Sequence, residues 1–235
     1  MPIYKYKEYL RIIRPLPEHV KRDRFDIPVI EPQKIDISAM NNGLWLINMK
    51  NISSKDKNAN RKIVHSFCYD DTLRRAYNDP LRYLARAAPY HAVSSFDFSM
   101  DSKMDFKNVL DATYENRWSG VFMQTHGKLV IPTVGWITSD TYDICFSGLR
   151  DGGVFIISSL GTNNPDSYPE FIAGYHEMRK RFPSTQIICV GDRLKGMDDD
   201  VCYVLYEESF GSWDKHQSYW QPKLFNWDGS IPKGV

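Results

Sequence analysis

Three aspartates lie in or just after short apolar runs of this sequence, near the points where strands of a parallel sheet would end. They are Asp71, Asp97 and Asp192. The carboxyl ends of parallel strands lie at one edge, where the connecting loops meet, so these side chains could converge on a ligand. Converging carboxylates can act as general acid and base, or bind a hard cation such as Mg²⁺. An Asp at a strand end can equally cap a helix or make a turn, and both roles stay open.

Hydroxyl, glycine and tryptophan residues follow the same set of runs. The candidate ligand-binding residues are Ser99, Trp136, Ser158, Ser159 and Gly161. The segment 158–162 could hold a phosphate through its N–H and hydroxyl groups, although it lacks the lysine and the glycine spacing of a P-loop. Trp136 could stack on a base or a sugar ring. An ordinary turn and a core tryptophan are the structural alternatives for these two features.

The histidines and cysteines lack the spacings of common metal and nucleophile motifs. The six histidines show no His-x-x-x-His or His-Glu-x-x-His pattern, so we expect no zinc site. The four cysteines form no Cys-x-x-Cys pair and are expected to be reduced, buried thiols of a cytosolic protein. A Gly-x-Ser-x-Gly elbow is also absent from the sequence. Mg²⁺ at the aspartates is the one cofactor that the residue types suggest, and the spacing identifies no metal.

Strands and helices alternate along most of the chain. Seven apolar or alternating runs predict strands at Leu44–Met49, Ile63–Tyr69, Ala92–Phe98, Leu129–Trp136, Val154–Leu160, Gln186–Val190 and Val201–Tyr206. Helices are predicted to start at Asp79-Pro80, to cover 106–118, and to follow a capping box formed by Ser167 and Glu170. This order predicts an α/β fold with a mostly parallel sheet. The sheet would be TIM-barrel-like or an incomplete barrel, because a full barrel takes about 250 residues. An open doubly wound sheet is the alternative.

The 235 residues are expected to form one domain, 1–235. Residues 1–35 are basic and are interrupted by Pro15, Pro17, Pro28 and Pro32, which predicts an arm or wrapping segment. Residues 210–235 are rich in aromatic side chains and are expected to pack back on the domain. No apolar run approaches the roughly 20 residues that cross a membrane, and the first ten residues lack the core of a signal peptide. We therefore expect a cytoplasmic protein with no membrane partner.

The stretch from His65 to Asp192 resembles a family described as a domain of unknown function, number 4417. The matching pieces are FCYDD at Phe67–Asp71, SFDFS at Ser95–Ser99, VIPTVGW at Val130–Trp136, CFSGL at Cys145–Leu149, ISSLGT at Ile157–Thr162 and FIAG at Phe171–Gly174. SFDFS departs from the more usual Pro-Asp-Phe-Ser form, and residues 1–60 and the aromatic tail lie outside the resemblance. The resemblance implies an origin in bacteriophages or other mobile elements, and therefore a bacterial host cell. It implies no particular reaction.

Two functions from different classes fit these observations. The first is an enzyme that acts on a phosphate- or ribose-containing substrate, a nucleotide or nucleic acid, at the carboxyl ends of the strands. In that case Asp71, Asp97 and Asp192 would carry the chemistry. The second is a non-catalytic protein of a mobile element that binds nucleic acid or a host or phage protein. The excess of Lys and Arg over Asp and Glu in residues 1–103 would favour it. One concave pocket lined by Asp71, Asp97, Trp136, Ser159 and Asp192 would favour the enzyme, whereas a flat face, or one plugged by the tail, would favour binding or assembly.

Overall fold

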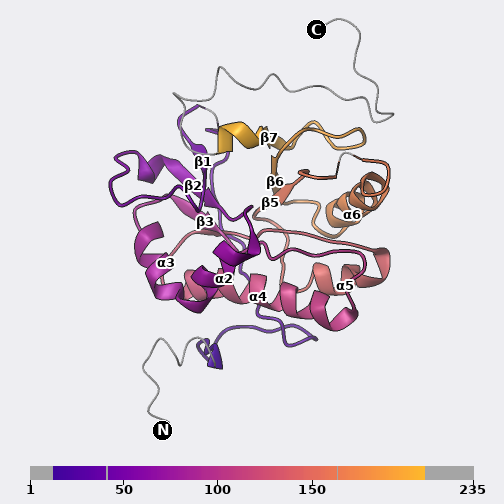
Figure 1. Ribbon diagram of the computed structural model, residues 1–235, viewed down its shortest axis with the longest axis horizontal. Helices are drawn as coiled ribbons and strands as arrows, with labels where there is room; N and C mark the ends of the chain where they lie inside the picture. Colours follow the sequence, from indigo (N-terminus) through magenta and orange to yellow (C-terminus); the bar gives the residue numbers. More distant parts are fainter. Residues whose placement is uncertain (1–12, 41, 163, 210–235) are drawn as a thin grey trace, which may run out of the picture.

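A computed structural model describes residues 13–209 of the chain, except residues 41 and 163. Seven strands run through this part (Figure 1): β1 Trp45–Asn48, β2 Lys62–His65, β3 Ala92–Ser94, β4 Val130–Ile131, β5 Val154–Ser158, β6 Gln186–Val190 and β7 Cys202–Val204. Each lies within, or within one residue of, an apolar run that predicts a strand. Every strand pair in the two ladders is parallel. The structure therefore confirms a mixed α/β fold with parallel strands.

The helices of the described residues lie between and around the strands. They are α2 Asp70–Asn78, α3 Pro80–Ala87, α4 Phe106–Thr125, α5 Tyr142–Cys145 and α6 Tyr168–Arg181, with 3-10 turns η1 Ala59–Arg61, η2 Ser139–Thr141 and η3 Tyr206–Ser209. The predicted starts of α3 and α4 are confirmed. The prediction of a capping box at α6 is wrong about the side chain of Ser167. Ser167 precedes the helix as predicted, but its hydroxyl bonds the Asn164 side chain instead of capping the helix. No helix among the described residues is both long and apolar enough to span a bilayer.

The strands follow one another in sequence order. One ladder has the order β1-β2-β3-β4 and the other the order β5-β6-β7. A parallel bridge between Thr133 and Ile156 joins the two ladders, through hydrogen bonds from Val134 N to Ile156 O and from Ile156 N to Pro132 O, both 3.0 Å long. Within the described residues no strand pairing connects β7 to β1, so this part of the chain forms no closed barrel. Instead, η3 packs against β1.

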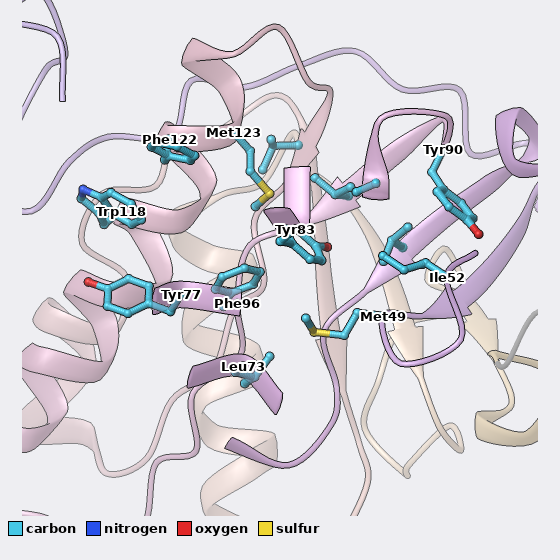
Figure 2. Close-up of a cluster of buried hydrophobic side chains, with 14 of the residues drawn as sticks. Met49, Ile52, Leu73, Tyr77, Tyr83, Tyr90, Phe96, Trp118, Phe122 and Met123 are labelled. Atoms are coloured by element: carbon cyan, nitrogen blue, oxygen red, sulfur yellow. The ribbon is translucent and has the colours of Figure 1, made fainter. Parts of the chain in front are cut away.

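One apolar core receives side chains from all seven strands. Its strand residues include Leu46, Ile63, Ala92, Ile131, Ile156, Ile188 and Val204. Apolar side chains from residues 35–44 join this core. Two further cores cover the opposite faces of the strands. The first lies between β1–β4 and helices α2–α4 and is rich in aromatic rings such as Tyr77, Phe96 and Trp118 (Figure 2). The second lies between the strands β5 and β6 and the helix α6, which lies beside these strands in Figure 1.

The described part of the predicted N-terminal arm lies against the helices. Arg14 donates a hydrogen bond to the carbonyl of Tyr77 at 2.6 Å, and its guanidinium lies 3.8 Å from the centroid of that ring. Trp118 donates its indole N–H to the carbonyl of Arg14 at 2.9 Å. Farther along, the carboxylate of Asp23 accepts the N–H of Gly148 at 2.9 Å. The predicted aromatic tail, 210–235, and the first twelve residues of the predicted arm lie outside the described residues.

A candidate active site at Asp97

Buried serine hydroxyls hold the backbone that follows β3. Ser66, just after β2, donates its hydroxyl to the carbonyl of Ser95 at 2.6 Å. Ser66 Oγ also accepts hydrogen bonds from the hydroxyl of Ser94 at 2.9 Å and from the backbone N–H of Asp97 at 3.1 Å. All three serines are at most 1% exposed. Because a buried hydrogen bond is costly to leave unmade, this network fixes where the chain places Asp97.

A second set of bonds ties the same segment to β4 and α4. The hydroxyl of Ser95 donates to Asn116 Oδ1 and accepts the N–H of Thr133, both at 2.8 Å. Thr133 returns its own hydroxyl to the carbonyl of Ser95 at 2.8 Å, and Asn116 donates its amide to the carbonyl of Thr133 at 3.1 Å. The end of β3, the end of β4 and the middle of α4 therefore form one rigid support.

Arg117 is a buried cation beneath this support. Only 2% of it is exposed, and its guanidinium donates to the carbonyls of Ser147 at 2.8 Å, Thr133 at 3.1 Å and Cys145 at 2.6 Å. These acceptors are neutral. Burial lowers the pKa of Arg117 to about 10, against the partly opposing charges of groups that include Asp97. Arg117 therefore supplies a positive field to the space in front of Asp97.

A small pocket opens at this point, between α4 and the loops that follow β3 and β4. Its lining residues are Asp97, Phe98, Met100, Ala112, Thr113, Asn116, Arg117, Gly135 and Cys145. It has room for about one water molecule beyond its open mouth. Thr113 is 3% exposed, and its hydroxyl has no hydrogen-bond partner among the described residues. A Cβ on Gly135 would lie 3.1 Å from Met100 Cε and 3.9 Å from Asp97 Oδ1, so the glycine leaves space beside the carboxylate.

The carboxyl group of Asp97 is poised to exchange a proton near neutral pH. Burial raises the pKa of Asp97 to about 7, the charge of Asp70 raises it further, and the charge of Arg117 opposes both. Asp70, the first residue of α2, is held in place by Ser99, which donates its N–H at 3.1 Å and its hydroxyl at 2.9 Å to Asp70 Oδ1. The structure therefore places Asp97, Asp70 and Ser99 in one neighbourhood.

Asp70 was not among the residues predicted from the sequence, whereas its neighbour Asp71 was. Asp71 is exposed on the first turn of α2, and Asp70 is the one whose charge reaches Asp97. Both belong to the FCYDD run, and no local pattern distinguishes two adjacent aspartates. Thr113 and Arg117 were also missed, because both lie inside a helix whose apolar spacing predicts only core residues. A buried arginine or threonine leaves no signal of that kind in a single sequence.

The loop after β5 uses its hydroxyls to bond the neighbouring strand. Ser158 donates to the carbonyl of Val190 at 3.2 Å, and Ser159 donates to the carbonyl of Asp192 at 2.7 Å. Gly161 has a φ of +75° and turns the chain. Asp192 is exposed. None of these four residues lines the Asp97 pocket. Whether they touch a ligand stays a prediction.

Trp136 lies against α6. Its indole N–H donates to the carbonyl of Phe171 at 3.1 Å, and its ring centroid is 5.2 Å from that of Phe171. Gly174 makes room for it, since a Cβ there would lie 2.0 Å from Trp136 Cδ1. The residue is partly buried in this contact and does not line the pocket at Asp97. Of the five residues expected to share one pocket, only Asp97 lines this one.

The thiol and metal chemistry of the described residues is limited. Burial raises the pKa of the Cys68 thiol to about 11, so at neutral pH this side chain is a thiol rather than a thiolate. No group of three or more His, Cys, Asp or Glu side chains gathers as a metal site in the part of the chain that the structure describes. Asp97 and Asp70 could still contribute two carboxylates to a Mg²⁺ ion that keeps most of its water ligands.

Comparison with known proteins identifies the family. The model of the family described as "Domain of unknown function (DUF4417)" matches residues 21–207. The chain therefore belongs to this family, and the resemblance predicted over 65–192 is confirmed. Over 137 residues, or 58% of this chain, it is 34% identical to "Gene 1 protein" of Mycobacterium phage L5 and 32% identical to "Gene 1 protein" of Mycobacterium phage D29. These matches cover 59% and 50% of the two phage proteins, so the chain spans little more than half the length of the curated relatives it matches. No solved structure matches the chain significantly.

Proposed function

We propose that this member of the DUF4417 family is a phage or mobile-element enzyme that acts on a nucleotide or nucleic acid, with Asp97 as its general acid or base. The observation that carries the proposal is the setting of Asp97. It lines a pocket together with the unpartnered hydroxyl of Thr113 and the buried guanidinium of Arg117. A carboxyl group with a pKa of about 7 is populated in both protonation states at neutral pH, which is what proton transfer in either direction requires.

Each neighbour of Asp97 has a role in this proposal. Arg117 lies where negative charge that develops on a substrate would be stabilised, because its field acts in a water-poor pocket. Thr113 can hold a water or a substrate hydroxyl, since its own hydroxyl has no other partner among the described residues. Asp70 raises the pKa of Asp97 further through its negative charge, which keeps Asp97 able to take up and release a proton near neutral pH.

We also infer that the seven strands form an incomplete barrel with this site at the carboxyl ends of β2, β3 and β4. Three observations support the inference: the parallel strands follow sequence order, Thr133 and Ile156 join the two ladders, and every strand contributes to one shared core. A doubly wound sheet would instead reverse its strand order at a switch point. In barrels the carboxyl ends of the strands carry the active site, which agrees with the position of Asp97.

Turnover by the full chain and two matched variants tests the proposed reaction. The protein is incubated with nucleoside mono- and triphosphates and with single-stranded DNA and RNA, with and without Mg²⁺, and products are separated by chromatography. Asp97→Asn should abolish turnover while its circular dichroism spectrum and unfolding transition stay those of a folded protein. Asp71→Asn, which removes an exposed carboxylate one helix position beyond Asp70, should retain it. Full turnover by Asp97→Asn, or no turnover of any member of the panel by the wild type, would contradict the proposal.

A further inference from the structure

Tyr69 presents an aromatic ring to solvent beside the proposed active site. It is 80% exposed, and the ammonium group of Lys50 lies 4.4 Å from the centroid of its ring. Tyr69 is the residue that precedes α2, in an extended conformation with φ of −58° and ψ of 141°. Its chain neighbours are Cys68 and Asp70, so the position of its backbone is determined by the same loop that places Asp70 near Asp97.

The surrounding charges place four chain segments at this point. The Cys68 thiol is influenced by the charges of Lys50, Asp70 and Asp97, which follow β1, β2 and β3 respectively. Tyr206, at the start of η3 after β7, is influenced by both Tyr69 and Cys68. An exposed aromatic ring, a lysine and two carboxylates therefore meet where the carboxyl ends of these strands come together.

We propose that Tyr69 and Lys50 form a nucleotide subsite, in which a base stacks on the open face of Tyr69 and Lys50 binds the adjoining phosphate. The inference rests on the proposed function of Asp97 and names the substrate class of that site. Stacking on an exposed aromatic ring contributes binding free energy for any nucleobase, whatever the sequence of the strand. Because the nearby carboxylates of Asp70 and Asp97 would repel a phosphate, a cation is needed beside the ring, and Lys50 supplies it. Ser99 donates two hydrogen bonds to Asp70 Oδ1, which partly offset the negative charge of that carboxylate.

Fluorescence anisotropy with a labelled oligothymidylate measures the subsite directly. Tyr69→Ala should weaken binding about tenfold, and Tyr69→Phe should bind within about twofold of wild type, because the ring that stacks is kept. An abasic deoxyribose-phosphate strand of the same length should bind the wild type weakly and should not distinguish the two variants. Competition with thymidine monophosphate then separates two sources of the same chemistry. Displacement indicates that a single nucleotide unit suffices, and its absence indicates that a strand is required.

Lysine variants test the phosphate contact. Lys50→Ala should weaken binding of both strands and reduce the dependence of the logarithm of the binding constant on the logarithm of salt concentration by about one unit. Lys34→Ala is the matched control, because Lys34 is exposed but follows Gln33, whose side chain bonds the first residue of β4 at the opposite end of the strands. Equal losses in the two variants would show that binding depends on net charge alone and would overturn the assignment of Lys50.

Asp97→Asn distinguishes failure of this inference from failure of the proposed reaction. That variant should lose turnover and keep strand binding, since the subsite does not need the Asp97 proton. Unchanged binding by Tyr69→Ala, or equal binding of the abasic strand and the oligothymidylate, would overturn the subsite and leave the acid–base proposal intact. Specific strand binding without any turnover by the wild type would support the subsite and contradict the acid–base proposal. If the wild-type protein binds none of the probes, the subsite is overturned.

Discussion

The hydroxyl of Ser66 accepts the backbone N–H of Asp97 at 3.1 Å. Through this contact Ser66, the residue after β2, helps to fix the backbone of Asp97, the third residue after β3, and with it the position of the Asp97 carboxyl group. The same hydroxyl also serves Ser94 and Ser95, so a single atom organises two neighbouring strand ends. The proposed chemistry of Asp97 thus depends on a side chain that does not line the pocket itself.

Ser66→Ala should lower the free energy of unfolding by about 2 kcal/mol, because it leaves the buried N–H of Asp97 without its acceptor, while the hydroxyl of Ser94 keeps the carbonyl of Ser95 at 3.0 Å. Urea denaturation measures this change, and Ser66→Thr should recover most of it by restoring the hydroxyl. Ser38→Ala is the matched control, since Ser38 makes its hydrogen bonds to Asp36 at the exposed surface and should cost less than about 0.5 kcal/mol. As Ser66 positions Asp97, the pKa of Asp97 measured by NMR should also shift in Ser66→Ala. A stability loss with an unchanged pKa would show that Ser66 has no part in positioning that carboxyl group.

The raised pKa of Asp97 predicts that the protein loses stability as pH rises. The folded state holds the Asp97 proton up to about pH 7, whereas the unfolded chain releases it near pH 4. Between these values the folded state binds more protons, so the free energy of unfolding falls with increasing pH. Asp97→Asn should remove this part of the slope and be more stable than wild type at pH 8, by about 4 kcal/mol. Urea denaturation of both proteins from pH 4 to 8 checks it. Asp71→Asn, with an exposed carboxylate, should keep the wild-type slope, and an unaltered slope in Asp97→Asn would rule the prediction out.

His65 predicts the opposite pH dependence. It is fully buried, its Nε2 lies 3.0 Å from the carbonyl of Ser209, and burial lowers its pKa to about 4. The unfolded chain binds the His65 proton near pH 6.5 and the folded state only near pH 4, so stability falls as pH drops through this window. The loss should reach about 3 kcal/mol at pH 4. His65→Gln should flatten the curve between pH 4 and 6.5, while His91→Gln, at a partly exposed histidine, should leave the curve as in wild type. A His65→Gln curve as steep as that of wild type would contradict the prediction.

Thr113 and Thr133 form a matched pair of buried threonines, 3% and 0% exposed. Thr133 donates its hydroxyl to the carbonyl of Ser95 at 2.8 Å, whereas the hydroxyl of Thr113 has no partner among the described residues. Thr133→Val should therefore cost about 1 to 2 kcal/mol of unfolding free energy. Thr113→Val should be neutral within about 0.5 kcal/mol or slightly stabilising, since it removes an unsatisfied polar group without changing the shape of the side chain. Chemical denaturation of both variants compares them. A larger loss in Thr113→Val would mean that its hydroxyl already bonds a tightly held water.

Local sequence patterns predicted the seven strands, three of the five helices and the α/β class of the described residues, but they predicted neither α2 nor α5. Each apolar run between polar turns contains a strand, because burying such a run requires an extended, hydrogen-bonded neighbour. The proline at Pro80 and the apolar spacing after Phe106 marked two helix starts correctly. The same local reading made Asp97 a candidate, since a lone carboxylate within an apolar run stands out in a single sequence, and its catalytic role stays a prediction. These are local signals, read over a few residues at a time.

Which polar groups meet depends on the packing of the whole chain. Asp70, bonded by Ser99, is the aspartate whose charge acts on Asp97, and α4 buries Arg117 and Thr113 beside Asp97. The tertiary structure also set Trp136 against α6 and bonded Ser159 to the strand next to it. These outcomes depend on contacts between residues far apart in the chain, such as Ser66 with Asp97. The hydrophobic pattern of a segment determines that it is buried, but the side chains it meets depend on the packing of the whole chain.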